Sequence, residues 1–205
     1  MTGNTVVAIL KQYLQDPDGI VWGDVYLNAV NESLKTIAML RPDSTANTIE
    51  LTLVANKYTQ FIPADGARLL YITRNIATGK PIRLLQREAL NELGNLWTPQ
   101  AVNDIDHYIY DIENPTAFGV FPVPDSALTV ELVYSVIPSD IGLSDTAIVP
   151  DQYISPVVEY CLYRLYEIET ERINRQKAAS HLAACYNVLG IKLQNEMMLK
   201  TIQEG

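Results

Sequence analysis

The hydrophobic period of this chain changes twice along its length. Before residue 45 and again after residue 149, apolar residues recur at the 3.6-residue spacing of a helix. Between these stretches they alternate with polar residues, which is the two-residue period of a half-buried strand. Because a segment with one period cannot bury the same residues in the other conformation, the order of elements is helices, strands and helices.

Helix boundaries are indicated by capping and stop residues. The first two helices are expected at about Thr5–Leu14 and Gly23–Leu40, the second ending at Arg41-Pro42. A third helix begins at Pro150-Asp151, since Asp is a good N-cap and Pro suits the first turn. The fourth covers about Glu171–Leu189, with Gly190 in position for a C-terminal cap.

The middle of the chain reads as strands separated by turn-rich links, as expected of antiparallel hairpins. A short helix at Gln86–Leu96 and a loop at Trp97–Asp106 interrupt them. The first strand starts at Thr48, and the others are expected at Tyr58–Ile62, Arg68–Ile76, Ile82–Leu84, His107–Ile112, Ala117–Phe121 and Leu128–Ile137.

We therefore predict an α+β fold, in which N- and C-terminal helices pack as a helical bundle with an inserted antiparallel β-sheet or small β-sandwich. The predicted division is 1–45 for the N-terminal helices, 46–148 for the β-rich insertion, 149–190 for the C-terminal helix pair and 191–205 for a C-terminal tail. At 205 residues the chain fits one domain, or one domain with a sizeable insertion.

Charge and composition exclude several classes of protein. The net charge of −9 argues against a surface that grips nucleic acid, because that grip depends on Lys and Arg replacing counterions. An acidic wall past which DNA slides without sticking is compatible with this charge. No apolar run approaches the roughly 20 residues that span a bilayer, and the start MTGNTVVAIL lacks the basic region of a secretory signal, so we expect synthesis in the cytosol.

Candidates for catalysis are few. The two histidines, His107 and His181, belong to no metal-binding motif, and His181 is expected in a solvated or cap-like role. Gly79-Lys80 resembles the end of a phosphate-binding loop, but Pro81 stands where that loop needs Ser or Thr. The two cysteines, Cys161 and Cys185, lie on apolar helix faces and are expected as reduced packing residues.

The best enzymatic candidate is a group of carboxylates with one imidazole, which could hold a divalent cation: Asp104, Asp106, His107, Asp111 and Glu113. Strand alternation, however, directs Asp106 to the face opposite His107, Asp111 and Glu113. We therefore predict no catalytic residue, no cofactor and no metal site. The alternative is a small metal-dependent hydrolase or nuclease that uses Asp104, Asp111 and Glu113.

The third helix carries three large aromatic rings on the side away from its core stripe, interleaved with charged residues. Two interpretations are open. The rings cover the neighbouring β-layer of the same chain, or they form a subunit interface, since Tyr and Arg are enriched in such surfaces. The predicted interface residues are Tyr160, Tyr163, Arg164, Tyr166 and Glu167.

The last fifteen or so residues have an apolar side beyond the expected helix stop at Gly190. A segment of this length is marginal as a free helix, so its apolar side needs a surface to pack on. It either continues the preceding helix or frays, or it inserts into a groove of another protein, where flexible Met suits an adaptable contact. Its apolar residues are Ile191, Leu193, Met197, Met198, Leu199 and Ile202.

A family resemblance rests on residues near both ends of the chain. At the C-terminal end these are Pro150-Asp-Gln-Tyr153, Val158, Tyr160, Leu162-Tyr-Arg164, His181 and Leu189-Gly190, and at the front Trp22-Gly-Asp24, Leu27-Asn28 and Arg41-Pro42. In these positions the chain resembles the head-to-tail adaptor, or connector, proteins of tailed bacteriophages of the short-tailed type. The likeness covers nearly the whole chain in layout, through helix punctuation and packing residues.

This resemblance implies a virion structural protein, made in the cytoplasm of the host bacterium. About a dozen copies would form a ring below the portal protein, extend the channel for double-stranded DNA without binding it specifically, and present a platform for tail or nozzle proteins. It implies that the helices form the ring body, that the 191–205 tail reaches the portal and that the β-insertion faces the tail, with no membrane partner. The alternative is another minor tail or virion binding module.

Overall fold

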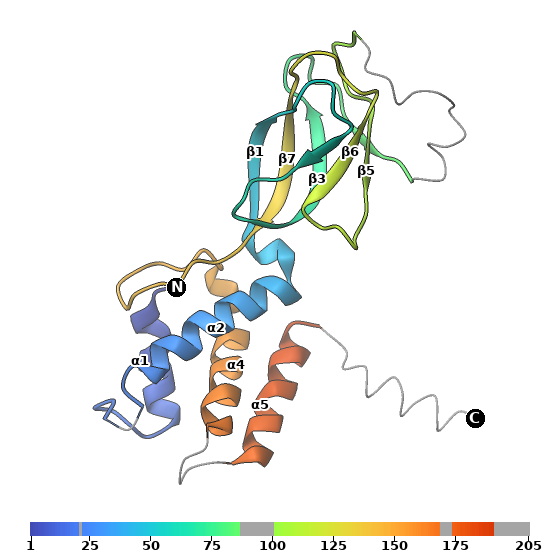
Figure 1. Ribbon diagram of the computed structural model, residues 1–205. Coiled ribbons are helices and arrows are strands. Elements are labelled where there is room, and N and C mark those ends of the chain that lie inside the picture. The colour runs from blue at the N-terminus through green and yellow to red at the C-terminus, as the bar shows by residue number, and fades with distance from the viewer. Residues whose placement is uncertain (21, 87–100, 169–173, 191–205) are drawn as a thin grey trace, which may run out of the picture. The chain divides into compact units, whose positions relative to one another are not determined.

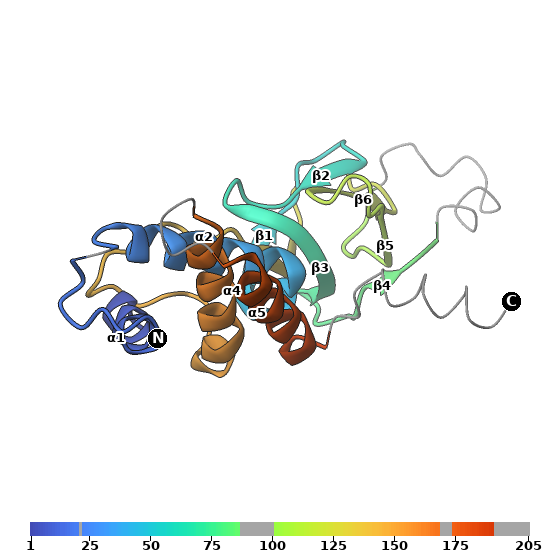
Figure 2. The same ribbon diagram turned by 90° about the horizontal axis from the view of Figure 1, so that it is seen from below.

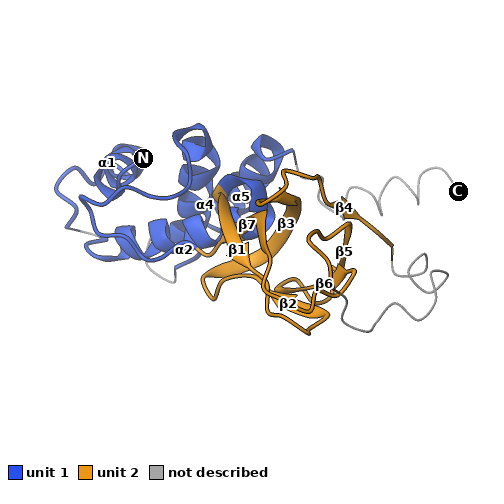
Figure 3. Ribbon diagram, turned by 90° about the horizontal axis from the view of Figure 1, so that it is seen from above, with its two compact units in different colours: residues 1–44, 138–205 blue, residues 45–137 orange. Residues whose placement is uncertain are grey.

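The computed structural model describes residues 1–20, 22–86, 101–168 and 174–190. The chain divides into two compact units, coloured separately in Figure 3. The first, which we call the helical unit, is Met1–Ser44 with Pro138–Gly205, and the second, which we call the β-unit, is Thr45–Ile137.

The described part of the helical unit contains α1 (Gly3–Tyr13), α2 (Val25–Leu40), α4 (Ile154–Glu167) and α5 (Arg175–Val188). Helix α4 contacts each of the other three helices (Figures 1 and 2). Short 3₁₀ turns at Pro42–Thr45 and Asp151–Tyr153 follow α2 and precede α4. The four helices predicted before and after the β-rich middle of the chain are confirmed.

One apolar core joins these helices, because each presents a stripe of aliphatic side chains to the others. Two polar links across the α2/α4 contact accompany it: Ser33 Oγ donates to Val157 O (3.0 Å), and Cys161 Sγ to Ala29 O (3.4 Å). Its most deeply buried members include Val6, Leu10, Val30, Leu34, Ile37, Val157, Cys161, Leu162 and Leu165.

Residues between the last strand and α4 belong to this core as well. Ile141, Ala147 and Val149 are buried in the helical core cluster, and Asn31 on α2 bonds the backbone of Ile141 through both side-chain atoms. The predicted insertion, 46–148, extends beyond the compact β-unit for this reason.

The β-unit consists of two sheets that share an apolar core. The three-stranded sheet has the order β1-β7-β3 and the four-stranded sheet the order β2-β6-β5-β4 (Figures 1 and 3). The bounds are β1 Ala46–Thr52, β2 Thr59–Phe61, β3 Gly66–Asn75, β4 Arg83–Leu84, β5 His107–Tyr110, β6 Ala117–Phe121 and β7 Thr129–Val136.

The α+β class is confirmed, but the sheets are not wholly antiparallel. Strands β4 and β5 pair in parallel, with Arg83 opposite His107 and Leu84 opposite Tyr108. Parallel neighbours need a connection of a dozen residues or more, and residues 85–106 provide one. Strand β5 also ends earlier than predicted, because Asp111 O accepts a turn bond from Asn114 N (3.0 Å).

Two predicted features fall outside the described residues. These are most of the helix at Gln86–Leu96 with the first part of the Trp97–Asp106 loop, and the tail 191–205. Among the described residues, no helix is long and apolar enough to cross a membrane.

Candidate interaction surface on the helical unit

The predicted interface residues lie on the C-terminal half of α4. Four of them, Tyr160, Tyr163, Arg164 and Tyr166, are half-buried, and Glu167 is exposed. Tyr160 and Tyr166 pack against the core of the helical unit. These two rings therefore have packing partners among the helices of their own chain.

Tyr166 joins α4 to α5. Its ring stacks on the His181 imidazole, with centroids 5.6 Å apart and planes 6° from parallel, and Lys177 Nζ lies 5.5 Å from the same ring. His181 Nδ1 is 2.7 Å from Glu159 Oε2 on α4. The sequence suggested a solvated or cap-like His181, and the structure instead gives it two partners on the neighbouring helix.

Arg164 joins α4 to α2. Its Nε lies 2.9 Å from a carboxylate oxygen of Glu32, and its Nη1 lies 3.4 Å from Glu167. Desolvation opposes the charge on Arg164, but the hydrogen bond and charge of Glu32 outweigh it and raise the pKa. The pair is about 40% exposed, so we expect it to orient the guanidinium and to add little stability.

An open groove lies beside these residues, between α4 and α5. Tyr163, Arg164 and Glu167 form part of its α4 side, and the Tyr163 ring meets Tyr160 edge to face at 5.4 Å. Desolvation, followed by its contact with Glu167, raises the pKa of Tyr163. The remaining lining residues are Ile168, Arg175, Ala178, Ala179 and Leu182.

This groove combines an aromatic ring, two guanidinium groups and small apolar side chains, which is a composition typical of protein–protein contacts. The five predicted residues thus divide into two groups. Tyr160 and Tyr166 support the helical packing, and Tyr163, Arg164 and Glu167 line the groove. Arg175, Ala179 and Leu182 were not predicted as neighbours of these residues, because their nearness to α4 depends on how the two helices align.

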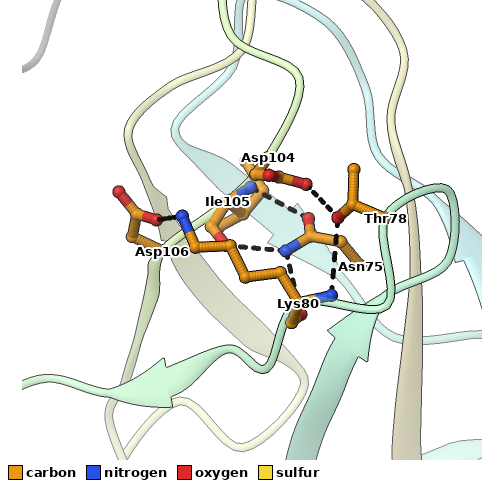
Figure 4. Close-up of polar contacts among 6 residues, drawn as sticks. All are labelled: Asn75, Thr78, Lys80, Asp104, Ile105 and Asp106. Carbon is orange, nitrogen blue, oxygen red and sulfur yellow. Dashed lines mark hydrogen bonds and ion pairs between the residues drawn. The ribbon is translucent and has the colours of Figure 1, made fainter.

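The carboxylates considered for a metal site are divided among separate contacts. Asp104 accepts a hydrogen bond from Thr78, and Asp106 pairs with Lys80 at 2.6 Å (Figure 4). Asp111 accepts a bond from Glu113 N (3.0 Å), and the His107 ring lies 6.5 Å from that of Phe121. In the described ranges, no three His, Cys, Asp or Glu residues are grouped so that they could hold a metal ion.

A buried amide fixes the loops that carry Asp104 and Asp106. Asn75 is 2% exposed, and its side chain donates to Ile105 O (2.8 Å) and Lys80 O (3.2 Å) and accepts from Ile105 N (2.9 Å), as Figure 4 shows. This role was missed at the sequence level, since no local pattern marks it. The hydrogen bonds of Asn75 thus account for the conformation of the loops around Asp104.

Both cysteines are free and buried in the helical core. Burial raises the pKa of Cys161 to about 12, and burial followed by the charge of Glu159 raises that of Cys185 to about 11. Thiols in this state are weak nucleophiles and poor metal ligands. Their predicted role as packing residues is confirmed.

Comparison with known proteins identifies the family. The family model described as SU10 adaptor protein matches residues 1–199. No curated protein matches the chain significantly. The match covers both units and confirms the resemblance to phage head-to-tail adaptors. The chain therefore belongs to the SU10 adaptor protein family of bacteriophage adaptors.

Proposed function

We propose that this protein is the head-to-tail adaptor of a short-tailed phage, in which about a dozen copies form a ring below the portal. The ring extends the DNA channel and carries tail or nozzle proteins. The observation that carries this proposal is the family match over residues 1–199, which includes both the helical unit and the β-unit.

A closed ring requires a heterologous interface, in which one surface of each copy contacts a different surface of the next. The groove between α4 and α5 supplies one such surface in this proposal. Tyr163 and Arg164 are its anchors, because aromatic and Arg side chains contribute most to the free energy of such contacts. Tyr160 and Tyr166 hold the helices that shape it, and Glu167 lies at its rim.

The acidic charge of the chain suits a channel wall. A net charge of −9 repels phosphates, so DNA moves past the ring without specific binding. The 191–205 tail lies outside the described residues, and in this proposal its apolar side, which includes Ile191, Met197 and Ile202, docks on the portal.

The test combines purified adaptor and portal. We expect a complex of ring size by size-exclusion chromatography and electron microscopy. Deleting 191–205 weakens binding to the portal, and Tyr163→Ala weakens contact between adaptor copies. Tyr71→Ala is the control, because it makes the same side-chain change on the β-unit, where Tyr71 is 52% exposed. A mixture that gives no complex, together with unchanged infectivity after deletion of the tail, would contradict the proposal.

A further inference from the structure

The four edge strands of the β-unit differ in how well they are protected from pairing with another chain. Strands β2 and β4 have only three and two residues. Strand β3 is longer, but its register against β7 shifts at three places. Its outer side is also bonded within the chain, through Leu69 N to Pro115 O (2.9 Å) and Ile82 N to Thr73 O (3.1 Å).

Strand β1 has none of these protections. All seven of its residues pair with β7 in continuous register, from Ala46 opposite Ser135 to Thr52 opposite Thr129. Within the described residues, no strand pairs with its other side. A long, regular and open edge of this kind is a template for one more strand.

The backbone groups available on that edge can be identified. Leu53 N donates to Leu128 O (2.7 Å), whereas Thr129 O accepts from Ile76 N (2.9 Å) on the β3 side. Since hydrogen-bonded and non-bonded pairs alternate along an antiparallel ladder, Asn47, Ile49 and Leu51 bond to β7. The amide and carbonyl groups of the alternate residues therefore face the open edge: Thr48, Glu50 and Thr52.

Three charged residues, one on each strand of the β1-β7-β3 sheet, lie in a row across it, and the last of them is on the open edge. Arg74 on β3 lies opposite Glu131 on β7 and pairs with it at 2.9 Å. Glu131 lies in turn opposite Glu50 on β1, and Glu50 is exposed. Directly opposed like charges destabilise a sheet, and in the described part of the chain Glu50 forms no ion pair. A cation beside Glu50 on a further strand would complete the row.

We propose that β1 accepts an extended segment of another virion protein as the fourth strand of the β1-β7-β3 sheet. The segment carries Lys or Arg opposite Glu50 and uncharged residues opposite Thr48 and Thr52. A second copy of this chain fits poorly as the occupant, because β1 itself contains no Lys or Arg and its one charged residue is Glu50, so a second β1 strand supplies no cation to this row. The inference concerns a different surface from the α4/α5 groove and does not depend on the ring.

Hydrogen exchange of β1 amides in the free protein and in assembled particles tests this proposal. In the free protein, the amides of Thr48, Glu50 and Thr52 exchange fast, and those of Asn47, Ile49 and Leu51 exchange slowly. In particles, the first three slow by about tenfold or more, and the others stay protected. If all three exchange equally fast in both samples, the proposal is wrong. If they are already protected in a pure oligomer of this protein, the occupant is a second copy and the proposal is also wrong.

Proline substitutions in β1 distinguish the loss of an outward-facing amide from the loss of a hydrogen bond within the sheet. Thr48→Pro removes an outward amide and leaves every bond to β7, so the isolated protein keeps its stability while tail assembly and phage titre fall. Ile49→Pro removes a bond to β7 and destabilises the isolated protein. A Thr48→Pro phage with normal titre and normal particle composition would overturn the proposal.

A charge reversal tests the row of charges. Glu50→Lys removes the attraction for a basic partner and lowers the yield of tailed particles. Glu113→Lys makes the same charge change at an exposed position on the turn after β5 and leaves the yield unchanged. Equal yields from the two variants would exclude a cation opposite Glu50.

Discussion

Single buried amides hold the loops of the β-unit in place. Asn75 bonds Lys80 and Ile105, and Gln60, which is also 2% exposed, bonds the backbone of Val54 and Lys57. Both satisfy backbone groups of neighbouring loops, and a buried group left unpaired costs about 1–3 kcal/mol.

Asn75 allows the first prediction at the residue scale. Asn75→Ala leaves Ile105 N and O without their side-chain partner, so we expect the free energy of unfolding to fall by about 2–3 kcal/mol, measured by urea denaturation. Thr78→Ala removes an exposed bond to Asp104 in the same loop and should cost less than about 1 kcal/mol. Equal losses from the two variants would mean that burial of Asn75 does not matter.

At the scale of the elements, α5 depends on a few specific contacts. Only Ala178 and Cys185 of this helix are buried, so its attachment to α4 relies on the stacking of His181 on Tyr166 and on the bond to Glu159. A helix with so little buried apolar surface opens at low free-energy cost.

We therefore predict that His181→Ala increases amide exchange across α5 and lowers the free energy of unfolding by about 1–2 kcal/mol. Lys177→Ala removes only the cation above the Tyr166 ring. We expect it to lower the free energy of unfolding by no more than about 0.5–1 kcal/mol and to change amide exchange in α5 correspondingly little. Exchange in α5 that matches the unmodified protein would show that Cys185 and Ala178 alone hold the helix.

The hydrophobic periodicity of the sequence predicted the helices and strands well, but it predicted poorly which of them pair or contact one another. Helix α2 and strand β7 follow from local patterns, because each buries one stripe or one face of its own sequence. The parallel pairing of β4 with β5 and the Glu159–His181 link depend on segments distant in sequence. The same limit applies to the groove, since the sequence indicated its α4 side and not its α5 side.

At the scale of the whole molecule, the two units have separate cores. Among the residues that the structure describes, none belongs to both the helical core cluster and the core cluster of the β-unit. A substitution that creates a cavity in one core therefore destabilises that unit directly. For a buried leucine changed to alanine, the free energy of unfolding falls by about 2–5 kcal/mol.

We predict that Leu132→Ala accelerates amide exchange in the β-unit alone and that Leu162→Ala does so in the helical unit alone. Both leucines are fully buried, so the two substitutions are matched in chemistry. Hydrogen exchange monitored by mass spectrometry distinguishes the units by their peptides. Equal acceleration in both units by either variant would show that the chain unfolds as one cooperative body.

The β-unit begins and ends on neighbouring strands. Ala46 lies opposite Ser135, and the hydroxyl groups of Thr45 and Ser135 are 2.9 Å apart. The chain thus leaves and rejoins the helical sequence at nearly one point in space. An inserted cassette with adjacent ends can be exchanged for another without stretching its host. Evolution can therefore change the part of the adaptor between residues 45 and 137 while the helical core is preserved, and the same junction suits grafting of an engineered domain.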